Sequence, residues 1–140
     1  MMKRHIAFIH TRDLIDFLGK KCPAHAYYSS AYYDTPDASS MNQKGWCGAD
    51  LIFDLDADHL PGAENLSYED MLENVKKELE KLVSFLVDDF GFTQQDIKLF
   101  FSGGRGYHCH VIHPRVHQLG SHERREIVAV SYTHLRAHET

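Results

Sequence analysis

The chain has 140 residues, 43% of them hydrophobic and 25% charged, which indicates one globular domain and excludes disordered and fibrous proteins. A formal net charge of −5 argues against a protein that coats nucleic acid by overall attraction, although a local basic groove is compatible with it. No apolar run approaches the roughly 18 residues of a membrane span, and the three cysteines lack C-x-x-C spacing, so we expect a cytoplasmic protein with reduced thiols.

The N-terminal third predicts a strand, a short helix and a loop. Residues Arg4–His10 are apolar at Ile6, Phe8 and Ile9 and predict a strand, and residues 11–21 predict a helix with Thr11 as its N-cap. Residues 22–46 combine turn-forming residues with four tyrosines, which predicts an ordered loop that covers a core.

An acidic strand is predicted over Asp50–Asp58. Its alternation places apolar side chains on one face and mostly carboxylates on the other. The apolar face comprises Leu51, Phe53, Leu55 and Ala57, and the opposite face comprises Asp50, Ile52, Asp54, Asp56 and Asp58.

A long helix and two strands follow. Ser67 and Asp70 resemble a capping box before an apolar stripe at helical spacing, and Gly91 is expected to end that helix. The stripe comprises Leu72, Val75, Leu79, Leu82 and Leu86. The segments "IKLFFSGG" and "GYHCHVI" predict two strands joined by a glycine turn, and the helix connects the acidic strand to the first of them. The expected fold class is α+β with a mixed sheet flanked by helices.

The last residues look foreign to this fold. The segment "VSYTHLRAHET" (Val130–Thr140) has no clear periodicity and matches the in-frame translation of a transposon adapter used in sequencing libraries. We therefore expect residues 1–129 to form a partial domain and residues 130–140 to be an artefact that is not part of the fold.

Two carboxylates indicate a metal site. Asp54 and Asp56 lie two residues apart, so on a strand they point the same way, separated by roughly 6 to 7 Å. Carboxylates favour hard cations such as Mg²⁺ or Mn²⁺, and two such ions can promote attack by a hydroxyl while stabilising a leaving pyrophosphate. The alternative is a solvated face of an edge strand, but neighbouring anions on one face repel each other unless something binds them.

The stretch Ser102–His108 supplies the opposite charge. Its three glycines let backbone N–H groups approach an anion, Arg105 offers a fork that matches phosphate, and Ser102 offers a hydroxyl. His108 and His110 share one strand face, where either can donate to a phosphate oxygen. The alternative is a glycine-rich hairpin with an exposed arginine. Neither alternative explains both segments together, so nucleotidyl transfer is the leading chemistry.

Five stretches occur in an order that resembles one family. They are "RHIAF", "YYSSAYY", "KGWCGADLIFDLDADHL", "LVSFLVDDFGF" and "LFFSGGRGYHCHV". Their pattern is similar to the catalytic small subunit of the archaeal and eukaryotic type of DNA primase, and most similar to archaeal members. The resemblance implies a nucleotidyltransferase of the replication machinery that makes short RNA primers on single-stranded DNA from ribonucleoside triphosphates. It also implies Mg²⁺ or Mn²⁺ as cofactor, a large regulatory subunit as partner, and a location at the nucleoid.

The same resemblance implies roles for particular residues. The D-x-D motif would bind the catalytic metals through Asp54 and Asp56, and S-G-G-R-G-x-H would bind the triphosphate through Ser102, Arg105 and His108. Arg4 resembles the family's arginine near the first strand and would also bind the nucleotide.

Three features depart from the family pattern. Its members have more chain before "RHIAF". Many of them also carry a zinc knuckle between the two motifs, whereas residues 60–101 of this chain contain no cysteine. No zinc site is therefore expected there. The family's third catalytic aspartate and a basic nucleotide contact follow at positions beyond Ala129. We expect an incomplete metal site, and no primer synthesis by the 140-residue chain.

Three other functions compete with this one. A primase-polymerase of DNA repair shares both motifs and differs in partner and sugar preference. A non-catalytic nucleic-acid-binding module would use the tyrosines to stack on bases, but it does not need the D-x-D motif. A phosphatase of the haloacid dehalogenase type also uses an aspartate pair, but it does not explain S-G-G-R-G-x-H.

Overall fold

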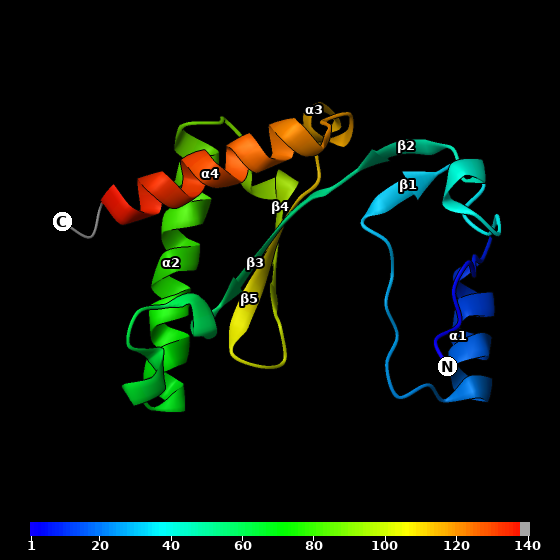
Figure 1. Cartoon of the computed structure of the whole chain (residues 1–140), viewed down its shortest axis with the longest axis horizontal. Helices are drawn as coiled ribbons and strands as arrows, with labels where there is room; N and C mark the ends of the chain where they lie inside the picture. The colour runs from blue at the N-terminus through cyan, green and yellow to red at the C-terminus, as the bar shows by residue number, and fades with distance from the viewer. Residues whose placement is uncertain (138–140) are drawn as a thin grey trace. The chain divides into compact units, whose positions relative to one another are not determined.

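The computed structural model describes residues 1–137, and Figure 1 shows their secondary structure. The chain divides after Ala49 into two compact units, residues 1–49 and residues 50–140. The sequence predicted one partial domain over residues 1–129, and that boundary stays a prediction. None of the helices among the described residues is both long and apolar enough to span a membrane.

The N-terminal unit consists of one helix, two short strands and a 3₁₀ turn. They are α1 (Thr11–Lys21), β1 (Ala31–Tyr33), η1 (Met41–Gln43) and β2 (Trp46–Ala49). The strands β1 and β2 pair antiparallel, and the register shifts between Tyr32 and Tyr33. Most of this unit's side chains are exposed.

Two predictions for this unit are wrong. Arg4–His10 forms no strand, because a strand needs a hydrogen-bonded neighbour and neither sheet of residues 1–137 includes this segment. The N-cap of α1 is His10, which has an extended backbone, whereas Thr11 is already helical. Tyr27 and Tyr28 of the tyrosine-rich loop are exposed, and the expectation that this loop covers a core stays a prediction.

The C-terminal unit is built on a three-stranded antiparallel sheet. Its strands are β3 (Leu51–Asp56), β4 (Ile97–Phe101) and β5 (Gly106–Val111), and their order is β3-β5-β4. The chain reaches β4 from β3 through α2 (Tyr68–Asp88), so β3 and β4 run parallel on opposite sides of β5. The α+β class is confirmed. The sheets are antiparallel rather than mixed, because the hydrogen-bonded strand pairs among residues 1–137 are all antiparallel.

Short elements complete this unit. The 3₁₀ turns η2 (Ala57–His59) and η3 (Ala63–Asn65) lie between β3 and α2, and η4 (Gln94–Asp96) precedes β4. After β5 come α3 (Pro114–His117) and α4 (Ser121–Ala137), and α4 crosses α2 in Figure 1. Helix α4 continues through Val130 without a break, and the Ser131 hydroxyl, which is buried, donates to the Ile127 carbonyl at 2.7 Å. Residues 138–140 of the predicted foreign segment lie outside the described residues.

Helix α2 forms where the sequence predicted it. The Ser67 hydroxyl accepts the Asp70 N–H at 3.1 Å and donates to the Asp70 carboxylate at 2.8 Å, which satisfies one of the unpaired donors at the start of the helix. After the last turn, Gly91 adopts a φ of +74°, and the Phe92 N–H donates to the Leu86 carbonyl at 3.1 Å.

The core lies between α2 and one face of the sheet. Leu79, Leu82 and Leu86 of the predicted stripe pack there with the alternating strand residues and with the helix that follows β5. The sheet and helix residues buried in this cluster are Leu51, Phe53, Cys109, Val111 and Val116. Burial raises the pKa of the Cys109 thiol to about 12. The predicted apolar face of the acidic strand is confirmed at Leu51, Phe53 and Ala57.

Arg124 of α4 ties the start of β3 to the helices. Its guanidinium donates to three backbone carbonyl oxygens at 2.7 to 2.8 Å, those of Asp50, Val116 and Leu119. The Asp50 carboxylate in turn contacts His117 Nε2 at 3.1 Å. These partly buried contacts fix the point at which the chain enters β3.

Gly106 is required at the first position of β5. It pairs with Asp56, and a Cβ at this position would overlap the Leu55 carbonyl oxygen. The backbones of β3 and β5 therefore approach each other more closely here than a side chain allows.

We predict that Gly106→Ala lowers the free energy of unfolding by about 1–3 kcal/mol, because β5 must shift away from β3. Urea denaturation followed by circular dichroism measures this. The control is Gly104→Ala, whose added Cβ would meet only Ser102 Oγ within 4 Å, at 3.8 Å. Equal stability of the two variants would contradict the close approach of β3 and β5.

Candidate active site

The pairing of β3 with β5 brings the two sequence motifs together on one face of the sheet. Asp54 pairs with His108, and Asp56 pairs with Gly106. Residues that pair directly share a face, and this face is opposite to the one that Phe53 and Cys109 bury in the core. The acidic motif and the glycine turn are therefore neighbours at the end of β3, on the side of the sheet away from α2.

Asp54 extends from the middle of β3 into solvent. Its side chain is 72% exposed, and its Oδ1 lies 3.4 Å from His108 Nε2. Its exposed carboxylate oxygens are therefore accessible to a cation from solution.

Asp56 ends the strand. Its Oδ1 accepts the Asp58 N–H at 3.0 Å, which starts the 3₁₀ turn η2. Asp58 was predicted on the same strand face as Asp54 and Asp56, and this prediction is wrong, because the turn takes Asp58 out of the strand.

The glycine turn is closed by its own hydrogen bonds. The Ser102 N–H donates to the Gly106 carbonyl at 3.0 Å, and the Gly104 N–H donates to Ser102 Oγ at 3.3 Å. Gly103 has a φ of +83°, a conformation that glycine adopts without strain. From α2, the Tyr68 hydroxyl donates to the Gly104 carbonyl at 2.8 Å and attaches the turn to that helix.

Arg105 is held at two points. Its carbonyl accepts the Ala57 N–H at 3.0 Å, and its Nη2 lies 2.6 Å from Asp58 Oδ2. The side chains of Arg105 and Asp58 are each about half exposed, at 49% and 51%. A carboxylate therefore contacts the guanidinium that the sequence assigned to a phosphate.

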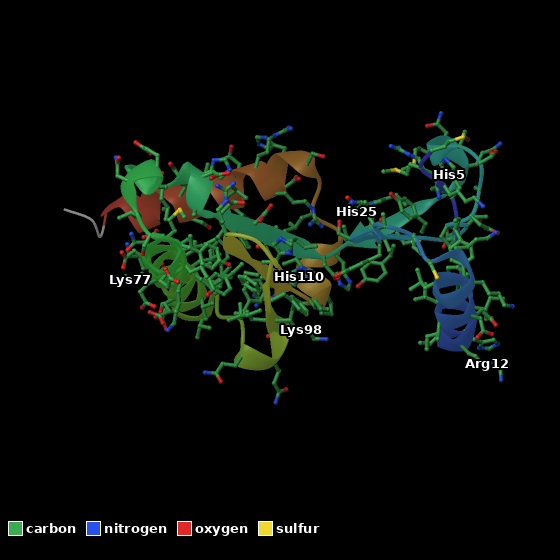
Figure 2. The ribbon with its side chains drawn as sticks, turned by 90° about the horizontal axis from the view of Figure 1, so that it is seen from below. His5, Arg12, His25, Lys77, Lys98 and His110 are labelled. Atoms are coloured by element: carbon green, nitrogen blue, oxygen red, sulfur yellow. The ribbon has the colours of Figure 1, made fainter. Side chains whose placement is uncertain are left out.

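His110 lies deeper in the same face. It is 8% exposed, and its ring centroid lies 4.9 Å from that of Phe100 and 6.2 Å from that of His108. Figure 2 labels it on β5 together with Lys98, its neighbour in register on β4. Burial and the nearby His108 lower the pKa of His110, and Asp50 opposes that shift.

The donor chemistry of the carboxylate pair fits a hard divalent cation. Asp54 and Asp56 present anionic oxygens on one face, as Mg²⁺ and Mn²⁺ prefer. Among residues 1–137, no group of three or more histidine, cysteine or acidic side chains is placed to hold a metal ion. Two side chains alone leave most of the coordination sphere to water or to the phosphates of a ligand.

The structure brings five of the predicted site residues together within the C-terminal unit. Asp54, Asp56, Ser102, Arg105 and His108 all lie at the end of the sheet where β3 meets the glycine turn. Arg4 belongs to the N-terminal unit, so its predicted contact with a nucleotide stays a prediction.

Sequence analysis missed two contributors to this site. Tyr68 holds the glycine turn from 36 residues away, and no local pattern marks it. Asp58 was placed only on the strand face, although a carboxylate is a typical partner for a guanidinium such as that of Arg105.

The sequence from the middle of β3 to the end of α4 matches a known family model. That model describes the DNA primase small subunit, and it matches residues 53–138. The chain belongs to the DNA primase small subunit family. The match covers both the aspartate pair of β3 and the glycine turn.

Individual members of this family are also similar. The chain is 60% identical over 128 residues to the DNA primase small subunit PriS of Methanosarcina acetivorans, covering 91% of this chain and 31% of the relative. It is 61% identical over 128 residues to PriS of Methanosarcina mazei, with the same shares covered, and 52% identical over 126 residues to PriS of Picrophilus torridus, covering 90% and 34%. The chain thus spans about a third of the length of these curated relatives.

We predict that His110 makes the stability of the fold depend on pH. Its pKa is lowered in the fold, so the unfolded chain takes up the proton more readily, and stability is lost as pH falls below about 6.5. Between pH 7.5 and pH 5.5, His110→Gln should therefore lose less free energy of unfolding than the unmodified chain. Urea denaturation at both pH values measures this, with His122→Gln, at an exposed position of α4, as the control. Equal losses in the His110→Gln and unmodified chains would contradict the burial of a neutral His110.

Proposed function

We propose that this chain is a catalytic part of a DNA primase small subunit that makes short RNA primers on single-stranded DNA. The substrates are ribonucleoside triphosphates, the cofactor is Mg²⁺ or Mn²⁺, and the partner is a large regulatory subunit of the replication machinery. The observation that carries the proposal is the pairing of Asp54 with His108 and of Asp56 with Gly106, which joins a cation-binding motif to an anion-binding motif.

The two aspartates serve as metal ligands in this proposal. A bound Mg²⁺ or Mn²⁺ supplies a Lewis acid that offsets the charge of the reacting phosphate oxygens. Asp54 and Asp56 hold their carboxylates on neighbouring positions of one strand face, and β5 supports both positions through the sheet. The strand thus fixes the spacing of the two anions before any ligand arrives.

The glycine turn binds the triphosphate. Arg105 has planar donors that match two phosphate oxygens at once. His108 lies beside Asp54, so it is next to a proposed metal ligand. The Ser102 hydroxyl accepts from the Gly104 N–H, so an arriving phosphate oxygen can exchange with Ser102 for that backbone donor. Tyr68 and Ala57 hold the turn in place through its carbonyls.

We predict that the double variant Asp54→Asn, Asp56→Asn binds Mn²⁺ at least tenfold more weakly than the 140-residue chain, because an amide keeps the shape of a carboxylate and loses its charge. Electron paramagnetic resonance of free Mn²⁺ measures the affinity. Asp37→Asn, at an exposed position of the N-terminal unit, is the control and should bind normally. Unchanged Mn²⁺ affinity in the double variant would show that the aspartate pair is not the metal site.

We also predict that Arg105→Ala weakens the binding of a fluorescent ATP analogue in the presence of Mn²⁺ by tenfold or more, since charge-assisted bonds to phosphate are lost. Fluorescence anisotropy measures the dissociation constant. Arg125→Ala, which removes an exposed arginine from α4, is the matched control. If Arg105→Ala bound the analogue normally but lost affinity for a single-stranded oligonucleotide, Arg105 would be a template contact instead.

A further inference from the structure

Asp58 contacts both a proposed metal ligand, Asp56, and a proposed phosphate ligand, Arg105. Its backbone N–H donates to Asp56 Oδ1 at 3.0 Å, and its carboxylate Oδ2 lies 2.6 Å from Arg105 Nη2. Asp58 is thus bonded both to one proposed metal ligand and to the main proposed phosphate ligand, although it belongs to neither the D-x-D motif nor the glycine turn.

The position of Asp58 is fixed by the backbone on both sides. The 3₁₀ turn η2 begins where the Asp56 side chain accepts the Asp58 N–H, and the Ala57 N–H donates to the Arg105 carbonyl at 3.0 Å. These two bonds align the turn that carries Asp58 with the strand end that carries Arg105. The backbone at the junction of β3 and β5 therefore places Asp58 next to Arg105, although both side chains are about half exposed.

The charges at this junction disfavour a bare polyphosphate. Asp54, Asp56 and Asp58 are three carboxylates that end at or near the same strand terminus, and Asp58 occupies one edge of the Arg105 guanidinium. A triphosphate without a metal must compete with Asp58 for Arg105 and must also approach the other two carboxylates. A triphosphate that carries a divalent cation meets an attraction from the same two carboxylates instead.

We propose that Asp58 is a specificity-determining residue that makes the site select metal-complexed triphosphates over free ones. It does so by competing with phosphate for Arg105 and by adding a third negative charge beside the aspartate pair. This inference rests on the proposed nucleotide site and adds to it a discrimination between two forms of the same substrate.

The test compares one dissociation constant under two conditions. A fluorescent ATP analogue is titrated with the 140-residue chain in EDTA and again in Mn²⁺, and the ratio of the two dissociation constants reports the discrimination. Asp58→Asn keeps the side-chain shape and removes the charge. It should bind the analogue about threefold to tenfold more tightly in EDTA, with a smaller change in Mn²⁺, so the ratio falls.

Three further variants make the result specific. Asp58→Ser removes the charge in a different shape and should also lower the ratio, and Asp58→Glu keeps the charge and should restore it. Asp89→Asn removes an exposed carboxylate after α2 and should leave the ratio unchanged. Circular dichroism identifies the variants that fold, and the comparison is made among those.

The outcomes separate the two proposals. If the unmodified chain binds the analogue in Mn²⁺ and removal of the Asp58 charge leaves the ratio unchanged, the role of Asp58 is wrong and the nucleotide site stands. If the unmodified chain binds the analogue under neither condition, the proposed nucleotide site is itself wrong, and the role of Asp58 falls with it. A lowered ratio in Asp58→Asn and Asp58→Ser, with recovery in Asp58→Glu, supports the proposal.

Discussion

The register of β3 against β5 is the constraint on which the rest of this structure depends. Six consecutive pairs, from Leu51 with Val111 to Asp56 with Gly106, align the acidic motif with the strand that follows the glycine turn. A shift of one residue would turn every side chain of β3 to the opposite face. Leu51 and Phe53 would leave the core, and Asp54 would enter it. The hydrophobic core and the candidate site therefore specify the same register.

The close contact at Gly106 limits that register at one end, and Arg124 fixes it at the other. A side chain in place of Gly106 would overlap the Leu55 carbonyl, so only a glycine can pair with Asp56 at this spacing. At the start of the strand, Arg124 bonds the Asp50 carbonyl and two carbonyls of the region after β5. Both ends of β3 are thus anchored by contacts that a slipped strand would lose.

The sequence predicted those parts of the fold that depend on local pattern. The stripe of α2, its Ser67 cap and the apolar face of β3 follow from periodicity and short-range hydrogen bonding, and the structure confirms them. Arg4–His10 also has apolar residues that favour a strand, but a strand needs a partner, and its partner cannot be inferred from the segment alone. Asp54 and Arg105 could be located from their motifs. The bond between Arg105 and Asp58 was missed, because it also depends on a partner distant in the sequence. That bond joins residues 47 positions apart and forms only after β3 and β5 are aligned.

Charge is distributed unevenly along this chain, and the distribution bears on how the site works. Residues 1–49 contain six lysines and arginines against four aspartates, a net charge of +2, so the total of −5 leaves −7 for residues 50–140. The unit that carries the candidate site is therefore the acidic one, and long-range electrostatics there oppose a polyanionic ligand. Attraction must come from a few short contacts, chiefly the Arg105 guanidinium and any cation that Asp54 and Asp56 attract. Because Asp58 already contacts that guanidinium, the charges of the protein alone give little net attraction for a triphosphate. A cation held by Asp54 and Asp56 would supply the attraction that favours binding.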